Sequence, residues 1–167
     1  ADNPRMLVDI DGNGSADVLG FGPISPFPFI AKNSFDGMPI RIESVVEGYA
    51  VETQIDYQRM SNPEVYTAAG PCGDCYPTMN IQGGPQLLVA QVDVIDQSIN
   101  LQTGVAAPLS TQYRYGEMRV DMHGRGGLGY AWTETEQLNS NAVSRVEYRQ
   151  DYPFIGKPSS ATEKING

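Results

Sequence analysis

Apolar and polar residues alternate with a period of two along most of this chain, and this pattern predicts β-strands. A strand with this period has one buried face and one solvated face. Val51, Thr53 and Ile55, for example, alternate with Glu52 and Gln54. The segments that show the pattern are 40–46 and 49–58, which flank a turn at Glu47 and Gly48, and then 86–95, 110–122, 128–136 and 142–150.

Turn residues separate these segments, so the pattern predicts a succession of hairpins. Asn139, Ser140 and Asn141 lie between the last two, and no segment has a sustained helical period. Without crossover helices, neighbouring strands pair antiparallel. We therefore expect an all-β fold with successive antiparallel hairpins in an open or wrapped sheet. Residues 60–84 are expected to form a long loop, and the chain is expected to end in a Pro/Ser-rich exit from Pro153.

The charge balance narrows the possible partners. The 167 residues include 11 basic and 20 acidic side chains, which give a formal charge of −9. Nucleic acids and anionic membranes are bound mainly by clustered Lys and Arg, and no apolar run approaches the ~20 residues of a membrane span. We expect no nucleic-acid partner, no membrane insertion by this segment, and a secreted or cell-surface location. The start at Ala1 suggests a processed or excised fragment.

The sequence D-x-D-G-N-G-x-x-D near the start provides oxygen ligands at alternate positions. These ligand positions are held by Asp9, Asp11, Asn13, Ser15 (through its carbonyl) and Asp17. Ca²⁺ takes about six to eight oxygens, and the intervening glycines permit positive-φ bends. We predict a short calcium-binding β-loop with a structural task, flanked by strands at 5–9 and 17–21.

The loop differs from an EF-hand, which needs helices on both sides and a Glu at the position that Gly20 occupies here. Asp, Asn and Gly also dominate ordinary β-turns. A turn without metal is therefore the alternative interpretation.

The two cysteines, Cys72 and Cys75, lie in the loop segment P-C-G-D-C-Y-P. A redox C-x-x-C normally begins a helix beside a βαβ pattern, and a zinc site needs more ligands than the single His123 can add. A local disulfide is the favoured interpretation, two free thiols come second and a catalytic dithiol third.

The sequence contains no recognisable catalytic constellation, and we do not expect an enzyme. His123 precedes a glycine-rich segment, 124–127, which is expected to be a tight corner whose Arg125 packs or pairs locally. Four aromatic residues on the predicted strands suit either a carbohydrate platform or, as the favoured interpretation, packing within the fold. They are Tyr113, Tyr115, Tyr130 and Trp132.

Two stretches resemble a known family. They are 113–130, YRYGEMRVDMHGRGGLGY, and 146–156, VEYRQDYPFIG. The chain resembles the region of Tc-toxin B components, SpvB-like proteins and related Rhs (YD-repeat) proteins that joins an FG-GAP/VCBS repeat domain to the Rhs shell. Tyr130 and Tyr152 stand where those proteins usually have Phe. The segment 61–66, SNPEVY, is similar to the family's D-P-x-V-Y passage, and the cation loop resembles a final FG-GAP/VCBS repeat.

The resemblance implies two regions, a calcium-loop repeat at 1–37 and an Rhs-shell-like β-hairpin domain at 38–167. It implies a non-enzymatic structural module of a secreted toxin-like protein, whose partners are other parts of a larger polypeptide or copies of itself. The alternative is a self-assembling extracellular fibre or adhesin subunit joined by β-strand addition. A thiol redox enzyme that uses Cys72 and Cys75 is the third hypothesis.

Overall fold

The structure is a computed structural model, and it describes residues 5–8, 10, 17–21, 28–32, 41–48, 50–96 and 107–165. Its regular elements are the strands β1 to β14, which form three sheets, and the described residues contain no helix. The expected all-β fold is confirmed. No helix in the described part of the chain is long and apolar enough to cross a membrane.

The N-terminal sheet contains β1 (Arg5–Val8), β2 (Asp17–Phe21) and β3 (Pro28–Ala31) in that order. All of its pairs are antiparallel, and β1 and β2 flank the predicted cation loop. The strands expected around this loop are therefore present. The expected boundary between 37 and 38 lies outside the described residues.

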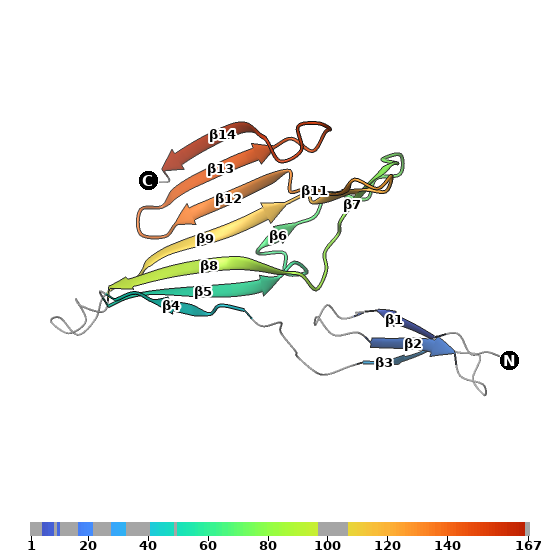
Figure 1. Cartoon of the computed structure of the whole chain (residues 1–167), viewed down its shortest axis with the longest axis horizontal. Coiled ribbons are helices and arrows are strands. Elements are labelled where there is room, and N and C mark those ends of the chain that lie inside the picture. The colour runs from blue at the N-terminus through green and yellow to red at the C-terminus, as the bar shows by residue number, and fades with distance from the viewer. Residues whose placement is uncertain are drawn as a thin grey trace.

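The main sheet has the order β14-β13-β12-β9-β8-β5-β4, with β6 beside β9 off this path (Figure 1). Its strands are β4 (Ser44–Val46), β5 (Val51–Arg59), β6 (Tyr66–Thr67), β8 (Leu87–Asp96), β9 (Leu109–Gly116), β12 (Trp132–Gln137), β13 (Ala142–Tyr148) and β14 (Pro158–Ile165). Neighbours on the path pair antiparallel, whereas β6 pairs parallel with β9. The sheet is open, with β4 and β14 at its two edges.

A third sheet has the order β11-β10-β7. Its strands are β7 (Thr78–Asn80), β10 (Arg119–Asp121) and β11 (Gly126–Gly129). The turn from β10 to β11 is the expected glycine-rich corner, and Gly124 and Gly126 have φ values of 97° and 74° there. Positive φ suits glycine because it has no Cβ to clash with the following carbonyl.

Two expectations about loops were wrong. The segment 60–84 contains β6 and β7, and the expected exit after Pro153 contains the eight-residue strand β14. Every residue of β14 is exposed, and most of them are polar. Because β14 buries neither face, its sequence has no alternating apolar pattern. Its place is set by its backbone pairing with β13 at the sheet edge.

The main sheet has one strongly polar face. Residues paired across an antiparallel ladder project to the same side, and the side alternates along each strand. The registers therefore place ten polar residues on one face, which are Gln54, Asp56, Gln91, Asp93, Gln112, Arg114, Glu134, Glu136, Arg145 and Glu147. The opposite face is made mainly of Val, Ile, Thr and Tyr.

The core lies where β6 enters the main sheet. The ladder between β8 and β9 ends at the pair Gln91 and Gln112, and beyond it β6 takes the place beside β9 (Figure 1). The buried cluster at this fork contains Met60, Val65, Tyr66 and Leu88. Partly buried residues from both the main sheet and the third sheet's flanks pack against it, and so the cluster joins the two sheets.

Candidate functional site

The two segments that carry the family resemblance meet in the structure. Gln150 follows β13, and its amide Nε2 donates to the carbonyl oxygens of Glu117 at 2.9 Å and Gly129 at 2.8 Å. One side chain thus connects the β9–β10 connection with the end of β11. Both of its amide hydrogens are used, because a carboxamide carries two of them.

The buried side chain of Asp121, a residue that is 6% exposed, stabilises the corner after β10. Its Oδ1 accepts the backbone N–H of His123 at 2.6 Å, and its Oδ2 lies 3.3 Å from Nη1 of Arg125. The Arg125 guanidinium in turn lies 4.8 Å from the ring centre of Tyr152. Arg125 therefore pairs and packs locally, as the sequence predicts, and it joins the corner to the R-Q-D-Y-P segment.

The turn between β13 and β14 is closed by a second set of contacts. Arg149 forms a short ion pair with Asp151, which raises the pKa of Arg149 and lowers the pKa of the Asp151 carboxyl through their hydrogen bond. The same guanidinium lies 4.2 Å from the ring centre of Phe154. These contacts shape the turn that positions β14 beside β13.

A buried tyrosine holds the two sheets together. Tyr66 donates its phenolic O–H to the carbonyl of Ile81 at 2.6 Å and accepts the N–H of Met118 at 3.0 Å. Its ring makes an edge contact with Tyr130, which also packs against Tyr115. Burial raises the pKa of Tyr66 and Tyr130, and it raises that of Tyr115 to about 12.

Three of the four strand aromatics make contacts within the fold. Tyr115 and Tyr130 pack against the core at Tyr66, and the indole of Trp132 lies under the guanidinium of Arg145 at 4.0 Å. These rings are engaged within the fold, so the packing interpretation holds for them.

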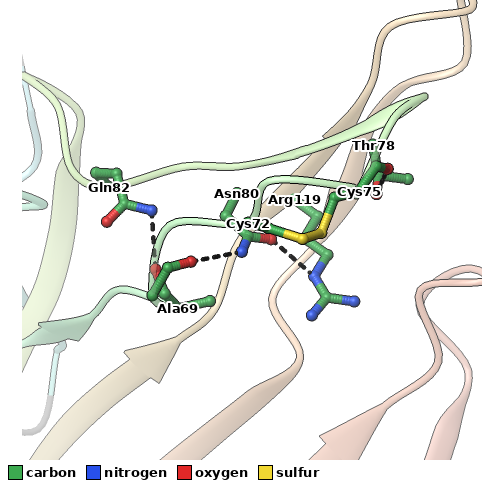
Figure 2. The surroundings of a disulfide bond; sticks show 8 residues. Ala69, Cys72, Cys75, Thr78, Asn80, Gln82 and Arg119 are labelled. Carbon is green, nitrogen blue, oxygen red and sulfur yellow. Dashed lines mark hydrogen bonds between the residues drawn. A yellow bond between two sulfur atoms is a disulfide. The ribbon is translucent and has the colours of Figure 1, made fainter.

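Cys72 and Cys75 are joined by a disulfide in the structure, with 5.5 Å between their Cα atoms (Figure 2). The loop around it is tied to neighbouring backbone and side chains. Asn80 Nδ2 donates to the carbonyl of Gly70 at 2.9 Å, and Asn80 Oδ1 accepts from Nε of Arg119 at 3.1 Å. The loop is therefore fixed to β7 and, through Arg119, to β10.

A second anchor of the same loop is an exposed aromatic pair. The Tyr76 hydroxyl lies 2.7 Å from Nε2 of His123, and the two rings meet edge to face. His123 thus has a structural partner across the third sheet.

We predict that the disulfide stabilises this loop. Replacing both Cys72 and Cys75 with Ser should lower the free energy of unfolding by about 1–2 kcal/mol, since the closed loop is short and little chain entropy is removed. Thermal melts with and without a reducing agent measure the effect, and the double variant should not respond to reductant. An unchanged melt of the reduced wild type would contradict the prediction.

The structure describes one of the predicted cation ligands, Asp17, whereas Asp9, Asp11, Asn13 and Ser15 lie outside the described residues. The carboxylate of Asp17 is fully buried, and its Oδ2 accepts the backbone N–H of Ile10 at 2.8 Å. This bond ties the last predicted ligand to Ile10, which stands between Asp9 and Asp11 in the sequence. The donor set is all oxygen, so its chemistry fits Ca²⁺. Within the described ranges, no three His, Cys, Asp or Glu side chains are grouped to hold a metal.

Gln150 and Tyr66 are among the residues of this site that reasoning from the sequence did not single out. Both lie inside segments that carry the family resemblance, but nothing in their spacing indicates the contacts that they make. Their partners lie 15 to 52 residues away along the chain.

Comparison with known proteins adds no family to these observations. A scan against protein-family models finds no matching model, and a search of curated proteins finds no similar one.

Proposed function

We propose that this chain is a non-enzymatic structural module of a secreted Rhs/Tc-toxin-like protein, where it forms part of the shell or scaffold around a toxin or effector. The observation that carries this proposal is the contact between the H-G-R-G corner and the R-Q-D-Y-P segment. Gln150 and the pair of Arg125 with Tyr152 bring together the two stretches that resemble the family. Side chains in these stretches connect separate turns of the fold, as expected for residues with a structural role.

The open sheet supports the same proposal. Among the described residues, β4 and β14 each pair on one side only, and a strip of hairpins with such edges and a less polar face is completed by neighbouring strands, as in other modular β-structures. The partners in this proposal are the adjoining parts of a larger polypeptide. The cation loop would stiffen the hairpin that precedes the strip.

The test is light scattering of the purified chain over a range of concentrations, alone and mixed with the Rhs-type segment that follows the R-Q-D-F-P stretch in a member of the family. The proposal expects scattering independent of concentration for the chain alone and a stoichiometric complex in the mixture. Absence of a complex, together with steady growth of scattering, would overturn it.

The second candidate is a self-assembling extracellular fibre or adhesin subunit. It is favoured by β14, whose eight residues are all exposed and which pairs on one side with β13. An eight-residue edge of this kind is a template for strand addition. Growth of the scattering signal with concentration, followed by filaments in electron micrographs, is the result that this candidate requires.

Calcium is the cofactor in both candidates. We predict that EDTA lowers the melting temperature and that added Ca²⁺ restores it, because the ion neutralises the clustered carboxylates and closes the loop. The variant Asp9→Ala with Asp11→Ala should lose this response. Asp74→Ala, which removes an acidic residue from the disulfide loop, serves as a control and should keep it. The same melting temperature in EDTA and in Ca²⁺ would refute the calcium site.

A further inference from the structure

A polar cleft opens on the main sheet at the fork between β8 and β9. It has a volume of about 620 Å³ and lies between β5, β8, β9 and the loop that leads into β6. Small-molecule sites typically have volumes of about 300–1,000 Å³. The cleft exists because the β8–β9 ladder stops at the pair Gln91 and Gln112, while the loop before β6 forms its other wall.

One wall of the cleft carries amides that are held in place by a chain of hydrogen bonds. Gln112 Nε2 donates to Oε1 of Gln91 at 3.3 Å, and Gln91 Nε2 donates to the carboxylate of Asp93 at 2.9 and 3.0 Å. The carboxylate fixes which end of each amide faces its neighbour, since it can only accept. Gln112 uses one of its two amide hydrogens in this chain.

A second chain of the same kind runs from Asn62 in the loop to Gln58 and Asp56 on β5. Asn62 Nδ2 donates to Oε1 of Gln58 at 3.4 Å, and Gln58 Nε2 donates to Oδ2 of Asp56 at 3.1 Å. Asn62 and Gln58 each use one of their two amide hydrogens in these bonds. Each amide oxygen also has two lone pairs and can accept a further hydrogen bond. The two chains thus line the cleft with oriented donors and acceptors.

The charges around the cleft disfavour an anionic ligand. Its one arginine, Arg114, is already paired with Glu134 at 3.1 Å and with Glu136 at 3.2 Å. Two acidic residues, Asp56 and Glu64, complete the charged groups in its lining. A phosphate or carboxylate would face these carboxylates without a free cation to bind it.

We propose that this cleft binds a neutral sugar residue of a glycan. Each sugar hydroxyl is both a donor and an acceptor, and so adjacent hydroxyls match amides that offer one of each. Prior orientation of the amides by their carboxylates lowers the entropy cost of binding. This inference goes beyond the scaffold function and is independent of it, because a module of a shell and a fibre subunit can each carry such a cleft.

Saturation-transfer NMR with the methyl glycosides of glucose, galactose, mannose and N-acetylglucosamine tests the proposal on the purified chain. At least one of the four should receive saturation from the protein. In a ¹⁵N-labelled sample, that sugar should shift the side-chain amide signals of Gln58, Asn62 and Gln112. This mapping uses the unmodified protein, so it does not depend on a variant that folds.

The matched variants are Gln58→Leu and Gln54→Leu. Gln54 lies on the same strand and face and donates to Glu52 at 3.0 Å, as Gln58 does to Asp56, but it is not part of the cleft's lining. Loss of one sugar hydrogen bond should weaken binding about tenfold in Gln58→Leu. Gln54→Leu should bind as the wild type does.

Either of two results would overturn the proposal. One is that none of the four sugars receives saturation from the protein or shifts the signals of the three amides. This result would overturn the proposal even if an extended peptide shifted the same signals. The other is that a sugar binds with the same affinity to the wild type, Gln58→Leu and Gln112→Leu.

Discussion

Replacing Tyr66 with Ala should lower the free energy of unfolding by about 3–5 kcal/mol, since it leaves a large cavity in the buried cluster. Tyr66 is 3% exposed, and its ring packs at the point where the main sheet and the third sheet join. Its hydroxyl also bridges Ile81 and Met118. Urea unfolding followed by circular dichroism measures the loss.

The variant Tyr66→Phe separates the ring from the hydroxyl. It keeps the packing but leaves the Met118 N–H and the Ile81 carbonyl without their bridge, so we expect a loss of about 1–3 kcal/mol. Tyr113→Phe is the matched control. Among the described residues no hydrogen bond joins the Tyr113 hydroxyl to a partner, and this change should be nearly neutral. If Tyr66→Ala unfolds no more easily than Tyr113→Phe, the cluster does not hold the sheets together.

Replacing Gly116 with Ala is expected to destabilise the protein by about 1–3 kcal/mol through overpacking. Gly116 is the last residue of β9 and pairs with Trp132 on β12. A Cβ at this position would overlap the indole of Trp132. The ring would have to leave its place under Arg145, and the contact between the indole and the guanidinium would be lost.

The fluorescence of Trp132 reports on this movement directly, because the chain contains a single Trp. We expect emission at longer wavelength in Gly116→Ala, together with a lower midpoint in urea. Gly84→Ala is a suitable control, since a Cβ there meets no atom within 4 Å. Unchanged emission and stability in Gly116→Ala would mean that the indole does not occupy the space above this glycine.

Local patterns predicted much of the main sheet. Thr53 and Ile55 alternate with Gln54 in the sequence. The register with β8 places Thr53 and Ile55 on one face and Gln54 on the other, as expected. The hairpin turn around Asn139–Asn141 is also present, with Asn141 at a φ of 52°. These features depend on residues close together in the chain, so a period-two alternation of apolar and polar residues and a turn signal are enough to predict them.

The strands without such a pattern were missed for a physical reason. Tyr66 and Thr67 of β6 are fixed by β9, which lies far along the chain, and β14 is fixed by the edge of β13. The cleft also depends on long-range pairing, because Gln91 and Gln112 meet only where β8 and β9 begin to diverge. A sequence pattern carries no signal for where two strands separate.

The sequence alone determined the all-β class, the hairpin order and the local corner at Gly124. Each follows from the preferences of residues close together in the chain, which act in any context. The tertiary structure decided which distant groups meet, as when Gln150 bridges Glu117 and Gly129 and when the amides of Gln58 and Gln112 come to line one cleft. Those contacts depend on the register and twist of the whole sheet, and no short stretch of residues sets either one.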